Sequence, residues 1–351
     1  MARLELKSVG RSFGVVRPAD GVSLTVEPGE IVAVFGPSGS GKTVLLRMIA
    51  GMFEPDQGDI LVDGRSIVGA APERRGIGMA FQNFALFPHM TARDNIASGL
   101  GAKATASDTA SRVEAISRLL KIEHVLGHAP RELSNGQKQR TALARALIGN
   151  PDVLLLDDPL RNVDAKLRYE MRLELPNLLR RGTAAVLYVT QDYREAMAIA
   201  DRIAVMDRGV VAQIGTSRDI YERPANTFVA GFMGTTNLVK GTVNPGIDGH
   251  AVFRSTGGLE IRIAQPNSMR VAADANVCIR PEALHLGATC SGVNAWPATV
   301  TLSTFLGNAI VYRLDVSGHA FEAHARPDEN FEVGANVVVS ADPASCTLLL
   351  N

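Results

Sequence analysis

The sequence predicts an α/β fold followed by a second domain built of β-strands. A glycine-rich loop stands between a β-type run at 30–35 and a helical run at 44–50. Beyond about Gly234 the pattern changes to short strands separated by Gly, Asn and Pro. We therefore expect one domain over 1–234 and an all-β domain over 235–351. Apolar runs typical of buried parallel strands, with helical stretches between them, occur at 153–156, 185–189 and 203–206.

The first domain begins with alternating apolar residues from Leu4 to about Phe35, which predict antiparallel strands leading into the glycine-rich loop. After the loop and its helix, turn residues at 55–58 and 63–64 indicate a short pair of strands. From about Ala92 to Ile148 the apolar residues follow helical spacing. We therefore expect a helical subdomain at about 85–150.

The glycine-rich loop carries the clearest chemical signal. Glycines let such a loop turn back on itself, so that backbone N–H groups point at phosphate oxygens beside a helix N-terminus. Lys42 would neutralise phosphate charge, and the hydroxyl of Thr43 would bind Mg²⁺ held between the β- and γ-phosphates. A plain glycine-rich turn is the alternative. The expected nucleotide-binding residues are Gly36, Pro37, Ser38, Gly39, Ser40, Gly41, Lys42 and Thr43.

Two carboxylates follow the apolar run 153–156. In a doubly wound sheet this strand end lies beside the phosphate loop. Asp157 would then hold Mg²⁺ indirectly, and Asp158 would face the γ-phosphate and polarise the attacking water. A strand end with a polar turn is the alternative. Ser134 precedes another helical run and is either a helix cap, an anion site, or both.

Composition limits the remaining function classes. The chain of 351 residues has 36 Lys and Arg against 36 Asp and Glu, so its charge favours neither a nucleic-acid duplex nor an anionic membrane surface. Cys278, Cys290 and Cys346 lie far apart, which argues against a zinc framework. The N-terminus lacks the apolar stretch of a secretory signal, and no window approaches about 18 uninterrupted apolar residues. We expect a soluble chain whose membrane role, if any, depends on partners.

Four motifs occur in a fixed order: the phosphate loop, Gln82 in Phe-Gln-Asn, the run Leu-Ser-Asn-Gly-Gln at 133–137, and the strand that ends in two aspartates. In this order they resemble ATP-binding cassette (ABC) transporter ATPases, a class of P-loop NTPase, through about Gly234. The segments 231–234, 279–282 and 305–308 resemble the OB-like regulatory domain, of the TOBE or MOP type, of maltose-type importer ATPases. The resemblance covers essentially the whole chain.

The resemblance implies two ATPase chains that sandwich two ATP molecules head to tail. Phe13 matches the aromatic residue that stacks on adenine, although a buried core residue is the alternative. Gln82 would bridge Mg²⁺ and the transport subunit. The segment 84–89 matches the surface that receives a coupling helix of the membrane subunit, unless it is ordinary core. The chain's own ATP would be served by Lys42, Thr43, Gln82, Asp157, Asp158 and Gln191, and the partner's ATP by Ser134, Gly136 and Gln137.

Four residues depart from the family pattern. Asp158 replaces Glu and is shorter by roughly 1.3 Å, and a misplacement of about 1 Å can reduce a rate about a hundredfold. Gln191 replaces the switch His and cannot shuttle a proton. Asn135 replaces a glycine, and Arg161 replaces a small Ser near the dimer seam. Asp158 and Gln191 fall in the same site, so we expect this chain's own site to hydrolyse ATP slowly.

The expected function is that of the ATPase subunit of a binding-protein-dependent importer at the cytoplasmic side of the inner membrane, in a bacterium or archaeon. Two permease subunits, an extracytoplasmic solute-binding protein and a second ATPase chain are the expected partners, with a consensus-site paralogue preferred over a homodimer. Carbohydrate or polyol is the expected cargo, and polyamine, ferric iron or another anion are alternatives. The remaining hypotheses are a non-transport ABC protein and a mainly regulatory nucleotide-binding subunit.

Overall fold

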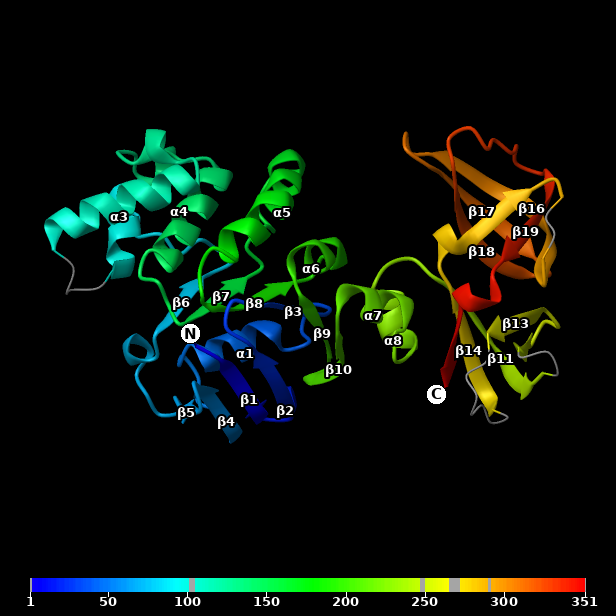
Figure 1. Ribbon diagram of the computed structural model, residues 1–351, viewed down its shortest axis with the longest axis horizontal. Helices are drawn as coiled ribbons and strands as arrows, with labels where there is room; N and C mark the ends of the chain where they lie inside the picture. The colour runs from blue at the N-terminus through cyan, green and yellow to red at the C-terminus, as the bar shows by residue number, and fades with distance from the viewer. Residues whose placement is uncertain (1, 101–104, 247–249, 265–271, 290–291, 351) are drawn as a thin grey trace. The chain divides into compact units, whose positions relative to one another are not determined.

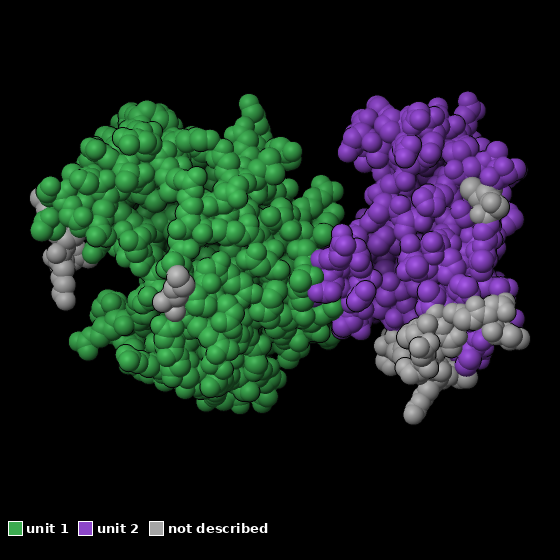
Figure 2. All heavy atoms as spheres, in the orientation of Figure 1, with its two compact units in different colours: residues 1–217 green, residues 218–351 purple. Residues whose placement is uncertain are grey.

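The computed structural model describes residues 2–100, 105–246, 250–264, 272–289 and 292–350. The chain forms two compact units, Met1–Ser217 and Arg218–Asn351 (Figures 1 and 2). Cys290 lies outside the described residues. Among the helices that the structure describes, none combines the length and the apolar character needed to cross a membrane.

The first unit opens with a four-stranded antiparallel sheet in the order β2-β1-β4-β5. Leu4 pairs with Val26 on one side and with Val62 on the other, and its side chain is buried. The predicted antiparallel strands and the predicted strand pair after the loop helix therefore lie in one sheet. Its strands are β1 (Leu4–Phe13), β2 (Val16–Val26), β4 (Gln57–Val62) and β5 (Arg65–Ser66).

A second sheet of the first unit carries the predicted buried runs, in the order β10-β9-β3-β8-β7-β6. Here the expectation for the segment before the loop is wrong, because β3 pairs in parallel with β8 and β9. Every residue of β3, β7 and β8 is buried, as expected for parallel strands covered on both faces. The strands are β3 (Ile31–Phe35), β6 (Ile77–Ala80), β7 (Val153–Asp157), β8 (Ala185–Thr190), β9 (Arg202–Asp207) and β10 (Val210–Gly215).

Along the chain the helices of the first unit are interspersed with its strands, and several of them lie in the stretch that was predicted to be helical (Figure 1). The segment expected to be helical contains α2, α3 and α4, whose buried residues include Ile96, Val113 and Leu143 in one hydrophobic cluster. The helices are α1 (Lys42–Ile49), α2 (Ala92–Ala97), α3 (Ala106–Leu119), α4 (Asn135–Leu147), α5 (Ala165–Leu179) and α6 (Tyr193–Ile199).

The second unit contains two five-stranded antiparallel sheets, β13-β12-β11-β14-β20 and β15-β19-β16-β17-β18, around one core. Its first elements are α7 (Ser217–Glu222) and α8 (Thr227–Phe232). The remaining strands are β11 (Asn237–Pro245), β12 (His250–Ser255), β13 (Glu260–Ala264), β14 (Ala272–Ile279), β15 (Leu284–Gly287), β16 (Asn294–Phe305), β17 (Ile310–Val316), β18 (His319–Ala325), β19 (Asn336–Ala341) and β20 (Cys346–Leu350).

The division between the units falls after Ser217, earlier than the expected boundary at 234. Arg280 supplies a physical reason, because its buried guanidinium donates hydrogen bonds to the backbone carbonyls of Tyr221, Ala230 and Thr235. The guanidinium also lies 4.1 Å from the centroid of the Tyr221 ring. The helical segment 217–232 is therefore tied to the β-strands that follow it.

Candidate functional site

The predicted phosphate loop connects the end of β3 to the start of α1. Gly41 has a φ of 103°, and a Cβ added there would lie 1.7 Å from the carbonyl oxygen of Pro18. A Cβ added to Gly36 would lie 2.2 Å from the carbonyl oxygen of Met206. Only glycine fits both positions, because the neighbouring backbone occupies the space that a side chain needs.

Lys42 is the first residue of α1 and is buried. Its Nζ donates hydrogen bonds to the carbonyl oxygens of Gly36 and Pro37, both at 2.7 Å, and to Ser40 Oγ at 3.3 Å. Burial lowers the pKa of Lys42 to about 8, although the negative charges of Asp158 and Asp157 act in the opposite direction. The ammonium group is therefore held inside the loop.

Thr43 joins the loop to the end of β7. Its Oγ1 donates a hydrogen bond to Asp157 Oδ1 at 3.2 Å. Burial raises the pKa of Asp157, although the Thr43 hydroxyl, Arg47 and Lys42 each act in the opposite direction. The hydroxyl and the carboxylate present two hard oxygen ligands of the kind that Mg²⁺ prefers.

Asp158 begins the turn after β7 in a left-handed conformation with a φ of 49°. Its amide donates to the carbonyl of Val189 at 2.8 Å, which ties the turn to β8. Burial raises the pKa of Asp158, with Arg161 as the largest opposing influence. Arg161 Nη1 lies 3.6 Å from Asp158 Oδ2.

A pocket of about 250 Å³ brings these predicted residues together. Gln82 and Gln191 also line it, so the candidate catalytic and metal-binding residues share one cavity. Sequence reasoning did not include Pro18 and Val189, which enter the lining only because β2 and β8 pass beside the loop. The lining residues are Pro18, Ser38, Gly39, Gly41, Lys42, Thr43, Val44, Gln82, Asp157, Asp158, Arg161, Val189 and Gln191.

The residues predicted to serve a partner's ATP lie elsewhere, at the start of α4, and are not among those that line this pocket. Ser134 and Gln137 form a reciprocal capping box: Ser134 Oγ accepts from the Gln137 amide, and Gln137 Oε1 accepts from the Ser134 amide. Gly136 is buried, and an added Cβ would lie 2.2 Å from Leu167 Cδ2. Ser134 is thus a helix cap, and its predicted role as an anion site remains a prediction.

Phe13 is not a core residue, since 43% of its surface is exposed. Its ring meets Phe53 edge to face, with centroids 5.6 Å apart, and the Arg11 guanidinium lies 5.1 Å from its centroid. The alternative of a buried core phenylalanine is therefore wrong. The ring remains available at the surface for stacking.

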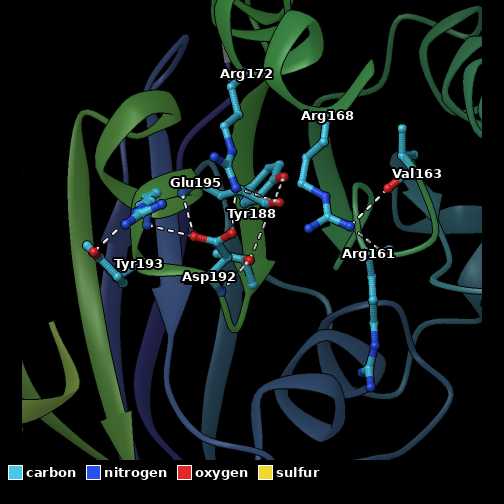
Figure 3. A network of polar contacts seen from close by, with 10 residues as sticks. Arg161, Val163, Arg168, Arg172, Tyr188, Asp192, Tyr193 and Glu195 are labelled. Carbon is cyan, nitrogen blue, oxygen red and sulfur yellow. Dashed lines mark hydrogen bonds and ion pairs between the residues drawn. The ribbon is translucent and has the colours of Figure 1, made fainter. Parts of the chain in front are cut away.

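A network of polar contacts around the buried Glu195 was missed by sequence reasoning (Figure 3). Glu195 on α6 is only 2% exposed, and its Oε2 accepts hydrogen bonds from Tyr188 OH at 3.1 Å and Thr190 Oγ1 at 2.9 Å. Arg172 on α5 reaches Glu195 Oε1 at 3.8 Å. The available signal was an isolated charge within the apolar face of a short helix.

A larger groove, of about 690 Å³, lies beside the segment predicted to receive a membrane subunit. Phe87 lines it and is 42% exposed, so the alternative of ordinary core is wrong for this residue. Arg145 donates to the carbonyls of Phe84 and Ala85, and its guanidinium lies 5.6 Å from the Phe87 ring centroid. Asn95 is fully buried and bonds both backbone groups of Phe87.

Comparison with known proteins agrees with this geometry. The ABC transporter family model matches residues 19–161, and the TOBE domain model matches residues 277–349. The spermidine/putrescine import ATP-binding protein PotA of Rubrobacter xylanophilus is 40% identical over 99% of this chain and 93% of its own length. The chain belongs to the ABC transporter ATPases. It is a transport ATPase that binds and hydrolyses ATP, with a C-terminal TOBE domain.

Further similarities come from one relative by sequence and from solved structures of one cassette. The sn-glycerol-3-phosphate import ATP-binding protein UgpC of Yersinia enterocolitica is 42% identical over 87% of this chain and 84% of its own length. The dimeric structure of the bacterial ABC transporter cassette MJ0796 has a TM-score of 0.56 and 29% identity, and covers 61% of this chain and 99% of its own. A second MJ0796 structure, bound to ADP and Pi, has a TM-score of 0.55. The predicted fold class, a P-loop ABC cassette followed by an all-β domain of the TOBE type, is confirmed.

Proposed function

We propose that this chain energises solute uptake as the ATP-hydrolysing subunit of a binding-protein-dependent importer. The observation that carries the proposal is the single pocket in which the phosphate loop, the Thr43–Asp157 pair and Asp158 meet. Two permease subunits, an extracytoplasmic solute-binding protein and a second ATPase chain would complete the importer. The chain would lie at the cytoplasmic side of the inner membrane of a bacterium or archaeon, without a nucleic-acid partner.

The residues of the pocket fit Mg·ATP. Thr43, Asp157 and Gln82 would hold Mg²⁺, which neutralises charge on the phosphates when it is bound. Lys42 and the loop N–H groups of residues 36–43 would bind the phosphates. Asp158 would orient the attacking water and accept its proton, and Gln191 would donate one hydrogen bond to the terminal phosphate.

A second chain would complete each site. Ser134, Gly136 and Gln137 would face the nucleotide of the partner, where the N-terminus of α4 offers backbone N–H groups. Their absence from this chain's own pocket lining supports a role in a neighbouring site. Phe13 would stack on adenine, which its exposed ring supports.

We expect hydrolysis at the chain's own site to be slow. Asp158 has a shorter reach than Glu, and Gln191 carries no charge, so two departures weaken the same site. A heterodimer with a paralogue that carries Glu and His would then contain one efficient site, whereas a homodimer would contain two slow ones. Analytical ultracentrifugation with Mg·ATP of this chain alone, and of its mixture with the paralogue, distinguishes the two assemblies.

The ATPase rate tests the weak site. In the double variant Asp158→Glu, Gln191→His, the rate of the purified chain should rise about a hundredfold, because the longer carboxylate and the imidazole restore the missing geometry. Lys42→Ala should abolish nucleotide binding and serves as the control. A wild-type rate already at the level of the double variant contradicts the slow-site proposal.

The groove beside Phe87 would receive the permease. It is the larger of the two cavities described above, and it exposes an aromatic ring. Arg145 in its lining donates hydrogen bonds to the backbone carbonyls of Phe84 and Ala85. Phe87→Glu should reduce co-purification with the permease while nucleotide binding is retained. Tyr169→Glu, an exposed aromatic on α5 outside the groove lining, is the matched control. Equal co-purification of both variants contradicts this interface.

Carbohydrate or polyol is our proposed cargo class. The UgpC relatives are named for sn-glycerol-3-phosphate, a phosphorylated polyol, which supports this choice. The PotA relative is named for spermidine and putrescine, so polyamine import is the second candidate, ahead of ferric iron and other anions. Uptake of labelled glycerol 3-phosphate and of labelled spermidine, in cells with wild-type chain or Lys42→Ala, separates the two. Lys42-dependent uptake of spermidine alone contradicts the polyol proposal.

A further inference from the structure

Arg161 brings a second positive charge into the nucleotide pocket. It lines the same cavity as Lys42 and Gln191. Its Nη1 lies 3.6 Å from Asp158 Oδ2, and its side chain is 51% exposed whereas that of Asp158 is 10% exposed. The guanidinium therefore lies at the solvent mouth of the pocket and the carboxylate lies inside it.

The backbone that carries Arg161 is held in place. Its amide donates to the carbonyl of Asp158 at 3.2 Å. Arg168 on α5 donates to the carbonyl of Arg161 at 3.3 Å and to that of Val163 at 2.9 Å. Figure 3 shows the Arg161 side chain extending away from Arg168 and from the Glu195 network. The loop is thus anchored on one side while the guanidinium projects from the other.

The pair with Asp158 is loose. At 3.6 Å the two atoms attract each other as charges but exceed the usual distance of an N–H···O hydrogen bond. Within the described ranges, Asp158 is the only partner that we find for this guanidinium. A guanidinium binds phosphate oxygens with its planar fork, and a phosphate of an ATP carries more charge than one carboxylate. A terminal phosphate in the loop would therefore compete well for Arg161.

We propose that Arg161 is a ligand of the terminal phosphate of ATP bound in this chain's own loop, and that it leaves Asp158 to bind there. The inference rests on the proposed nucleotide site. Arg161 supplies a cation in the pocket, whereas Gln191 carries no charge. ADP lacks the terminal phosphate, so Arg161 distinguishes ATP from ADP.

Affinity for the two nucleotides tests the assignment. Dissociation constants of the full chain for Mg·ATP and Mg·ADP are measured by isothermal titration calorimetry, so no turnover is needed. Arg161→Ser should weaken ATP binding by about tenfold to a hundredfold, the range of a charge-assisted hydrogen bond. ADP binding should weaken by less than about fivefold, as for an exposed charge. Arg161→Lys should recover part of the ATP affinity, because it keeps the charge without the fork.

Arg118→Ser is the matched control, because Arg118 is an exposed arginine paired with Glu123 and does not line the pocket. It should leave both affinities unchanged. Equal losses for ATP and ADP in Arg161→Ser, or no loss, overturn the Arg161 assignment and leave the proposed site standing. A wild-type chain that binds neither nucleotide overturns both.

Discussion

Arg172 on α5 donates a hydrogen bond to Asp192, with Nη2 2.5 Å from Oδ2. Asp192 directly follows Gln191 and caps α6, since its other carboxylate oxygen accepts from the amides of Arg194 and Glu195. The arginine thus joins the helix after the Arg161 loop to the turn that carries Gln191 (Figure 3). The residue next to Gln191 is therefore bound by a side chain from a different helix.

Removal of this arginine should destabilise the chain. Arg172→Met leaves the buried Glu195 and the half-buried Asp192 without their cation, so we expect a loss of about 2 to 3 kcal/mol in the free energy of unfolding. Urea denaturation measures the loss. Arg180→Met breaks the exposed pair with Asp201 and should cost less than about 1 kcal/mol. Equal losses in the two variants would show that the Arg172 contacts stabilise the chain no more than an exposed ion pair does.

Glu195 should make stability depend on pH. Burial raises its pKa above the ordinary 4.5, while Tyr188 and Thr190 donate to the carboxylate, Arg172 faces it, and Asp192 and Asp158 repel its charge. The folded chain therefore binds a proton that the unfolded chain has already released, so stability falls as pH rises from about 4.5 through the raised pKa.

Glu195→Gln keeps one amide oxygen that can accept from both hydroxyl groups, and it cannot ionise. The urea midpoint of the wild type should fall between pH 4 and pH 7 because of Glu195. The midpoint of Glu195→Gln should not show this fall. Asp201→Asn, which alters an exposed carboxylate, is the control and should keep the wild-type pH dependence. Parallel pH profiles for wild type and Glu195→Gln would contradict the assignment.

The two glycines with positive φ inside the phosphate loop should differ in their tolerance of alanine. Gly39→Ala meets no described atom within 4 Å at a φ of 82°, so only backbone strain of about 1 to 2 kcal/mol is expected. Gly41→Ala adds a clash with the carbonyl of Pro18 at 1.7 Å, which a fixed strand cannot relieve. Thermal unfolding should show the larger loss for Gly41→Ala. A smaller loss there would mean that β2 moves freely.

Asn95 should hold the shape of the segment that we propose to face the permease. It accepts from the Phe87 amide and donates to the carbonyls of Phe87, Met90 and Thr91. Asn95→Ala removes the side-chain partner of the Phe87 amide and of the Met90 carbonyl, whereas the Phe87 and Thr91 carbonyls still accept from backbone amides. We therefore expect a loss of about 2 kcal/mol and faster proteolysis at 84–91. Asn177→Ala, at an exposed position of α5, should be close to neutral. Unchanged proteolysis would contradict the role of Asn95.

Residues close together in the chain were the easiest to predict. The phosphate loop was found because its spacing, from Gly36 to Thr43, is set by a strand, a turn and a helix in direct succession. The direction of β3 was predicted wrongly, because β8 and β9, which pair with it, follow more than about 150 residues later. The boundary at Ser217 also depended on a distant residue, Arg280, whose partners are backbone carbonyls without a sequence signal.

The sequence by itself determined the ABC cassette and its TOBE domain, and it predicted which residues would bind phosphate and Mg²⁺, because these features depend on short motifs with local geometry. Only the tertiary structure decided that Arg161 faces Asp158 and that Glu195 is buried against Tyr188 and Thr190. The pairing energy of a charge depends on its distance to other charges and on its exclusion from water, and both quantities are set when separate segments pack together.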